Sequence, residues 1–316
     1  MELSGIHHLT AVTSDAPRNY DFYTRALGLR LVKKTVNQDD VSAYHLFYAD
    51  GVGSPGTDIT FFDWPVEREQ RGTCSITRTG MRVGGSDALV WWKRRLHDLG
   101  VAHSDLTERD GRLTLDFEDF EGQRLSIVDD TMVGDAHPWE QSTVPAEFQI
   151  RGLGPVTISV PDLRSTEIVL TKLLGMTLVR DYAALGHEGS HTFVYQMRPG
   201  GAAAELHVAV EPSLPVAQPG AGGAHHVAFR IPDVDYEVWA ERLSQARVPS
   251  SGPVDRFWFR SLYLREPNGI LFEIATDGPG FATDEPMDKL GETLSLPPFL
   301  EGRRRQIEAG LQPLTG

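Results

Sequence analysis

Short apolar runs alternate along the chain with single amphipathic segments, in an order that repeats. The first run, residues 5–12 (GIHHLTAV), is followed by Asp15, a residue type that caps helices. Three more strand-like runs follow at 29–36, 44–49 and 57–62. The pattern predicts a strand, a helix and three further strands, which together form one βαβββ module.

The same order of elements recurs three more times. An offset of 147 residues places Asp15 on Asp162 and the segment LGLRLV on LGMTLV. Offsets of 218 and 72 residues place Asp15 on Asp233 and on Asp87. Self-similarity at fixed spacing indicates repeated structural units. We therefore expect four modules, beginning near residues 5, 72, 152 and 223, with each of these aspartates near a helix start.

The length of the chain bounds its domain organisation. A chain of 316 residues is too long for one small core. We expect an α+β fold in which residues 1–150 and 151–290 form two domains of two modules each. Residues 291–316 are expected to be a closing helix or arm that takes no part in chemistry.

Composition excludes several classes of function. With 40% apolar and 23% charged residues, the chain is that of an ordinary globular protein, and no apolar run approaches a membrane span. The start of the chain lacks the pattern of a signal peptide, and Cys74 has no second cysteine to pair with, which favours a cytoplasmic protein. The net charge of −14 argues against nucleic acid and anionic membranes as partners.

Histidine is used in an unusual way. With 11 histidines in 316 residues, chance predicts about 0.4 His-His pairs, yet the chain has one at 7–8 and another at 225–226. Both pairs stand near the start of an apolar run, at the same place in the first and fourth modules. Chance pairing on strand ends is the alternative to a functional cause.

The modules and these pairs together carry a family resemblance. Four βαβββ units with HHLT in the first and HHVAF and GILFE in the fourth resemble the vicinal oxygen chelate superfamily of glyoxalases, bleomycin resistance proteins and extradiol dioxygenases. The resemblance runs from residue 5 to about 280, and within the superfamily the chain is most similar to dioxygenases that cleave hydroquinones and chlorohydroquinones. It implies cupped, incomplete β-barrels, made from paired modules, that hold one metal ion.

Strand alternation selects one histidine of each pair. Successive side chains of a strand point to opposite faces. His7 shares its face with Leu9 and Ala11, and this apolar face should pack against a helix. His8 and, by the same reasoning, His226 should point into the concave side of the sheet.

A carboxylate completes the candidate metal site. Glu273 lies in the apolar strand GILFEIA, where an unpaired charge would cost several kcal/mol. It therefore needs a cation or a proton, whereas the equivalent position of the second module, Ser126, carries no charge. The alternative is pairing with a buried arginine, Arg256 or Arg260.

The repeat predicts one site and not two. The third module has Pro155 in place of His8, and Phe61 and Phe62 stand where a carboxylate of the first module would lie. Two imidazoles and one carboxylate are typical of non-haem Fe(II) oxygen chemistry, and the resemblance implies the same ligands. Fe(II) is thus the expected cofactor, with Mn(II) as the alternative ion, and structural zinc is disfavoured. Glyoxalase-type relatives carry a fourth protein ligand that is missing here.

Further residues are expected beside the metal. Tyr263 shares a face with Ser261 and should point inward beside the Glu273 carboxylate. The resemblance makes Tyr263 a catalytic group that acts on an oxygen intermediate, and Arg256 a substrate-binding group that orients a phenolate. It also implies His225 as a catalytic proton relay, although alternation puts His225 on the opposite face. Thr10 shares the face of His8 and is a second substrate-binding candidate. The alternative is a tyrosine of the barrel wall and a solvated arginine.

Five other histidines fit no ligand spacing and are expected at the surface or in loops. They are His45, His137, His187, His191 and His207.

The triad and the resemblance together favour a non-haem Fe(II) ring-cleaving dioxygenase of extradiol type. Its partners would be dioxygen and a small aromatic diol, a hydroquinone or a catechol, and the sequence is compatible with a homo-oligomer. One alternative is a metal-dependent glyoxalase-type isomerase or hydrolase. Another is a protein that sequesters a small drug, against which the predicted metal ligands count.

Overall fold

The computed structural model contains the four predicted βαβββ modules and describes residues 1–132, 134–183 and 191–314. The first module comprises β1 (Ile6–Thr13), α1 (Ala16–Asp21), β2 (Arg30–Val36), β3 (Tyr44–Ala49) and β4 (Asp58–Asp63). The second comprises β5 (Ser75–Val83), α2 (Ser86–Asp98), β6 (Thr107–Arg109), β7 (Arg112–Glu118) and β8 (Arg124–Asp129).

The second half of the chain repeats this order. The third module comprises β9 (Gly152–Val160), α3 (Leu163–Ile168), β10 (Thr177–Ala183), β11 (His191–Gln196) and β12 (Glu205–Val210). The fourth comprises β13 (Ala224–Ile231), α4 (Tyr236–Gln245), β14 (Val254–Asp255), β15 (Arg260–Arg265) and β16 (Leu271–Thr276). Two short helices, α5 (Pro298–Glu301) and α6 (Arg304–Gly310), follow. The predicted α+β class and the fourfold repeat are confirmed.

The repeated aspartates lie at helix starts, as predicted. The Asp15 carboxylate accepts a hydrogen bond from the backbone N–H of Arg18 at 3.1 Å and so caps α1. Asp162 immediately precedes α3, and Asp87 lies in the first turn of α2. Asp233 begins the short 3₁₀ turn that leads into α4.

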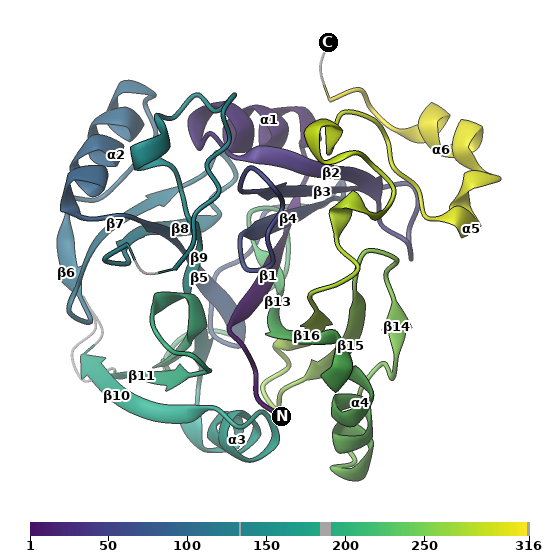
Figure 1. The fold of residues 1–316 in the computed structure, drawn as a ribbon. Helices are drawn as coiled ribbons and strands as arrows, with labels where there is room; N and C mark the ends of the chain where they lie inside the picture. Colours follow the sequence, from purple (N-terminus) through teal and green to yellow (C-terminus); the bar gives the residue numbers. More distant parts are fainter. Residues whose placement is uncertain (133, 184–190, 315–316) are drawn as a thin grey trace.

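The strands form two curled sheets of eight strands each (Figure 1). The first sheet has the order β14-β15-β16-β13-β1-β4-β3-β2, and the second has the order β10-β11-β12-β9-β5-β8-β7-β6. The first sheet therefore joins the first and fourth modules, and the second sheet joins the second and third.

The sheets do not follow the boundary expected at residue 150. Residues 1–150 and 151–290 each contain two modules, but each sheet takes one module from either half of the chain. The cause is the pairing of first strands, because β1 pairs antiparallel with β13, and β5 pairs antiparallel with β9. The chain thus begins one cup, builds the other completely and then returns to close the first.

The segment after β16 covers one edge of the first sheet, on the side of β2 (Figure 1). The ammonium of Lys33 on β2 is fully buried; it contacts Asp284 at 2.8 Å and also pairs with Glu285. Leu296, Leu300 and Ile307 then form a small cluster with a valine of β2. The expected closing helix is thus a pair of short helices. No helix in the described part of the chain is long and apolar enough to cross a membrane.

Candidate metal centre

Three predicted ligand residues meet at the centre of the first sheet. His8 on β1, His226 on β13 and Glu273 on β16 lie on three adjacent strands. The Nε2 atoms of His8 and His226 lie 3.1 Å and 2.9 Å from Oε2 of Glu273, and 3.4 Å from each other. All three residues are buried.

The shape of this group fits one metal ion. Ligand bonds of about 2.1 Å at right angles put neighbouring ligand atoms about 3.0 Å apart, close to the three distances observed. Oε2 of Glu273 is buried and accepts no hydrogen bond of proper geometry from the described residues. Its other oxygen, Oε1, accepts a hydrogen bond from the hydroxyl of Ser261 at 2.5 Å. One carboxylate oxygen is therefore anchored, and the other faces the two imidazoles.

His7 determines that Nδ1 of His8 carries a hydrogen. Nε2 of His7 lies 3.0 Å from the carbonyl oxygen of Thr276, which can only accept, so this nitrogen carries the hydrogen. Burial, together with the neighbouring His8, lowers the pKa of His7 to about 3, so its ring is neutral and its Nδ1 must accept. The donor is Nδ1 of His8, 2.8 Å away. With a metal ion bound, His8 in this orientation would offer the Nε2 lone pair to the ion.

His226 is held in a similar way. Its Nδ1 lies 2.7 Å from Nδ1 of His225. Burial, together with the neighbouring His226, lowers the pKa of His225 to about 3. His225 packs against the rings of Phe62 and Trp64 and does not line the cavity. The first histidine of each pair thus stands behind the second and orients it.

Glu273 remains ionised in this environment. Burial by itself would raise its pKa, but the imidazoles of His8 and His226 outweigh that cost and hold the pKa well below its ordinary value. Neither candidate arginine neutralises it, since Arg256 binds Asp39 at 2.9 Å and Arg260 binds the carboxylate of Glu237. The arginine alternative is therefore wrong.

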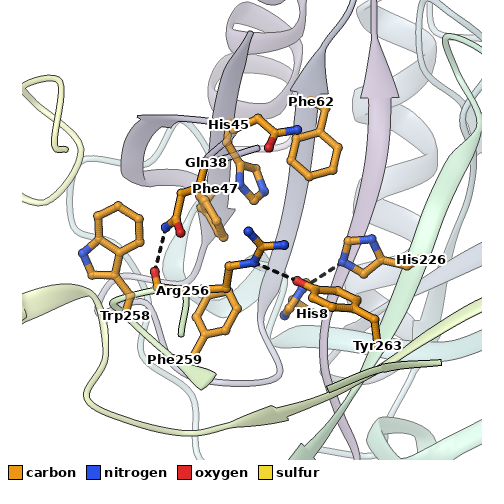
Figure 2. A pocket seen from close by; sticks show the side chains of 11 residues that line it. His8, Gln38, His45, Phe47, Phe62, His226, Arg256, Trp258, Phe259 and Tyr263 are labelled. Carbon is orange, nitrogen blue, oxygen red and sulfur yellow. Dashed lines mark hydrogen bonds between the residues drawn. The ribbon is translucent and has the colours of Figure 1, made fainter. Parts of the chain in front are cut away.

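A cavity of about 380 Å³ opens from His8 and His226 (Figure 2). Its walls are mainly aromatic, with a few polar groups. The lining residues are His8, Asn37, Gln38, His45, Phe47, Phe62, His226, Arg256, Trp258, Phe259 and Tyr263. A site of this composition suits a small aromatic molecule with a few hydrogen-bonding groups.

The structure brings Tyr263 and Arg256 to this cavity. Arg256 Nε donates to Tyr263 Oη at 3.2 Å (Figure 2). Its Nη2 donates to Asp39. Burial, and then the negative charge of Glu273, raise the pKa of Tyr263, so its side chain stays a phenol. Thr10 is not among the lining residues, and its hydroxyl is instead 2.8 Å from the hydroxyl of Thr60.

Two histidines lie where the sequence analysis did not expect them. His45 is on β3 and lines the cavity, with Nε2 2.9 Å from Thr60 Oγ1. His207 is buried on β12 of the second sheet. The assignment of both to the surface or to loops was wrong; the run YHLFYA, which places His45 between buried positions, was the available signal. His137 and His191 are exposed, and His187 lies outside the described residues.

Strand register also corrects the position expected for a fourth ligand. Thr60 opposes Thr10 on β1, as Glu273 opposes Ala228 on β13. Thr60, and not Phe61 or Phe62, is therefore the counterpart of Glu273 in the first module. A neutral hydroxyl supplies no anionic ligand, so the set remains at three residues.

Comparison with known proteins identifies the family of the whole chain. Residues 5–124 and 152–274 match the model of the Glyoxalase/Bleomycin resistance protein/Dioxygenase superfamily. MhqA of Bacillus subtilis (strain 168), a candidate ring-cleaving dioxygenase, is 48% identical over 99% of this chain and 100% of its own. The chlorohydroquinone/hydroquinone 1,2-dioxygenase of Sphingobium indicum is 30% identical over 96% of this chain and 95% of its own.

Solved structures agree with this result. The crystal structure of a candidate dioxygenase from Bacillus subtilis has a TM-score of 0.89 and 36% identity, over 99% of this chain and 97% of that one. Glyoxalase I from Zea mays shares the fold, with a TM-score of 0.63 at 14% identity, over 86% of this chain and 92% of that one. The chain therefore belongs to the Glyoxalase/Bleomycin resistance protein/Dioxygenase superfamily.

Proposed function

We propose that the protein is a non-haem, ring-cleaving dioxygenase that opens a hydroquinone-type ring with dioxygen. The observation that carries the proposal is the set of three ligand atoms, within 3.4 Å of one another, at the end of a small aromatic cavity. His8, His226 and Glu273 would hold Fe(II), with Mn(II) as the alternative ion. The ion would supply coordination positions for substrate and dioxygen and a path for electrons between them. The names of the relatives support the same reaction.

The cavity walls hold the ring of the substrate. Phe47, Phe62 and Phe259 offer aromatic surfaces, and Trp258 is anchored by a hydrogen bond from its indole N–H to Asp284 at 2.9 Å. Aromatic walls exclude water and fix the orientation of a flat ligand.

Tyr263 has the properties of a proton donor. Its oxygen already accepts a hydrogen bond from Arg256, so its own O–H is available to an oxygen of the reacting ring. The raised pKa keeps this hydrogen in place at neutral pH. Tyr263 would thus donate to developing negative charge, while Arg256, held by Asp39, keeps the phenol in position.

His45 would receive the second hydroxyl of the diol. The sheet order places β3 and β15 on opposite arms of the cup, with β1 and β13 between them, so His45 and Tyr263 lie on different walls. Burial lowers the pKa of His45 well below its ordinary value, which makes the ring neutral. Its Nε2 is engaged by Thr60, and its Nδ1 has no hydrogen-bond partner in the part of the chain that is described.

Oxygen uptake tests this function. Protein purified without oxygen and loaded with Fe(II) should consume one dioxygen for each hydroquinone lost, and product analysis should show extradiol-type cleavage beside a hydroxyl-bearing carbon. No uptake with any hydroquinone or catechol, together with isomerisation of a thiol adduct, would establish the glyoxalase-type alternative instead. Tight binding of a drug without metal or turnover would establish the sequestering alternative.

A variant of His45 tests the orientation of the diol. His45→Phe should raise the KM for hydroquinone about tenfold, because a hydrogen bond to the second hydroxyl is lost. The KM for catechol, whose hydroxyls are adjacent, should change much less. Equal changes for both diols would contradict a specific role for His45.

A further inference from the structure

The second sheet contains an open cleft of about 980 Å³, which we call the arginine cleft. Four arginines line it: Arg71, Arg78, Arg109 and Arg124. A smaller neighbouring cavity shares two of these arginines and reaches Ser126 and His207. The concentration of guanidinium groups is notable in a protein with a net charge of −14.

Strand register shows that this cleft takes the place of the metal centre. Arg78 opposes Thr157 on β9, the counterpart of Thr10, and therefore holds the position that His226 has in the first sheet. Ser126 opposes Gly80 as Glu273 opposes Ala228, so a hydroxyl stands in the place of the ligand carboxylate. In the second sheet a permanent side-chain cation thus replaces a metal ligand.

The correspondence continues around the cleft. Asp116 opposes Ser126 on the next strand, as Tyr263 opposes the glutamate ligand in the first sheet. Arg109 precedes Asp116 by seven residues, and Arg256 precedes Tyr263 by seven. Both arginines contact that partner directly. The arginine cleft is therefore the counterpart of the aromatic cavity. Arg109 in its wall holds the position that Arg256 has in the first sheet.

The carboxylates of Asp116, Glu118, Glu69 and Glu211 lie among the four arginines, but several guanidinium N–H donors have no acceptor in the described part of the chain. The two oxygens of Asp116 accept from Nη1 and Nη2 of Arg109 at 3.1 Å and 2.5 Å, and one also accepts from Ser126. Arg78 shares this carboxylate at 3.3 Å through Nη1, which also donates to the carbonyl of Leu125. Nε and Nη2 of Arg78 have no acceptor in the described ranges of the chain.

The remaining arginines add further donors. Arg124 is engaged only through Nη2, with Glu69 at 3.3 Å, and Arg71 only through Nη2, with Glu118 and a backbone carbonyl, among the residues described. Burial lowers the pKa of Arg78, and the neighbouring charges of Arg109 and Arg124 lower it further against the pull of Asp116. The guanidinium groups are therefore crowded at the cleft, although Glu118 and Glu211 offset part of their charge.

A metal ion is not the natural occupant of this sheet. Asp110, Glu205 and His207 form a compact group beside the cleft, but arginines already bind its carboxylates. Arg112 contacts Glu205 at 2.7 Å, and Arg180 contacts it at 2.9 Å. The hydrogen-bond donors left without an acceptor beside this group, among the residues described, belong to Arg78 and Arg124.

We propose that the arginine cleft binds a small carboxylate or phosphate anion through the free donors of Arg78 and Arg124. Guanidinium groups match the planar oxygen pairs of these anions and bind them in a bidentate manner. The hydroxyls of Thr157, Thr192 and Tyr182 line the same cleft and provide further hydrogen bonds to such a ligand. The proposal is independent of the metal centre, because the two sites lie in different sheets.

Calorimetric titration of the full-length protein with inorganic phosphate and, separately, with succinate tests this site. At least one anion should bind saturably at one site per chain, and the stronger of the two identifies the class of ligand. Arg78→Gln should weaken binding at least tenfold, whereas Arg304→Gln, which removes a half-buried arginine of α6 outside the second sheet, should leave it unchanged. Glu273→Gln and metal-free protein should bind the anion like the wild type, which separates this site from an anion on the metal.

Three outcomes overturn the proposal. The first is the absence of saturable binding of both anions. The second is equal weakening by Arg78→Gln and Arg304→Gln, which would mean that general charge and not a site attracts the anion. Thr192→Val provides a second variant that keeps every charge, and its affinity should fall about threefold while its melting temperature confirms an intact fold. An unchanged affinity in both Arg78→Gln and Thr192→Val would also disprove the site.

Discussion

The two sheets of the protein share one strand order and differ in the charges at their concave sides. In the first sheet, two imidazoles and one carboxylate converge, and no described residue places a side-chain cation between them. In the second, Arg78 and Ser126 hold the positions of His226 and Glu273, and Pro155 replaces His8. The backbone provides two similar cups, and a few register positions decide which of them fits a metal ion.

The comparison also separates two ways of stabilising a buried carboxylate. Glu273 depends on two imidazoles and on the ion that they would share with it. Glu205 is also nearly inaccessible, but it is neutralised within the protein by Arg112 and Arg180. Removing the charge of Glu273 should therefore disrupt metal binding in the first sheet. Removing the charge of Glu205 should instead lower the stability of the fold.

The largest effect is expected for Glu273→Gln. Loss of the anionic ligand should abolish stoichiometric metal binding and lower the rate of oxygen uptake at least about 10³-fold, with the fold intact. Elemental analysis and circular dichroism measure the two quantities. The matched control is Glu205→Gln, which removes a buried carboxylate from the second sheet and should retain full metal content. A Glu273→Gln protein with normal metal content and activity would contradict the assignment.

Tyr263→Phe should have the next largest effect. Its kcat should fall about 100-fold while KM changes less than about threefold, because the hydroxyl acts mainly in the transition state. Tyr195→Phe removes a buried hydroxyl from the second sheet and should leave both constants unchanged. If KM rises and kcat is preserved, Tyr263 binds the substrate and does not donate to an intermediate.

Glu205→Gln should destabilise the protein without affecting the metal. Arg112 and Arg180 would each lose a charged partner, at a cost of about 2–3 kcal/mol in the free energy of unfolding. Urea denaturation measures this difference. A Glu205→Gln protein as stable as the wild type would show that solvent already screens these pairs.

The smallest effect is the pH dependence of the difference in unfolding free energy between the wild type and Glu205→Gln. Burial of Glu205 opposes ionisation, but His207 and the arginines outweigh it and hold the pKa well below its ordinary value. The unfolded chain binds this proton at about pH 4.3, so the ionic contribution is complete above that pH and is lost as the pH falls toward the lower folded pKa. The stability difference between wild type and Glu205→Gln should thus shrink by about 1–2 kcal/mol between pH 6 and pH 3. A difference that stays constant over this range would mean that Glu205 is not ionised in the folded protein.

Most of the local structure could be read from the sequence, because it depends on neighbours in the chain. Asp15 caps its helix through a backbone N–H three residues away. The repeated Leu-Gly pairs end helices because residues such as Gly28 and Gly175 adopt positive φ angles of 70° and 72°. Alternation placed His8 and His226 on the concave face for the same local reason.

Contacts between distant strands were harder to predict. Thr10 shares the face of His8, but its hydroxyl is bound to Thr60, because β1 pairs in parallel with β4. His45 reaches the cavity because β3 follows β4 in the curled sheet. No spacing in the sequence specifies either relation.

The sequence by itself determined four modules, the faces of their strands and a buried carboxylate in need of a cation. Only the tertiary structure decided that the first module pairs with the fourth, so that His8 and Glu273 lie in one cup. It also decided that the second sheet collects arginines around Asp116. The physical reason is that periodicity and capping act within about one turn or one strand, whereas sheet pairing is decided by the packing of the whole chain.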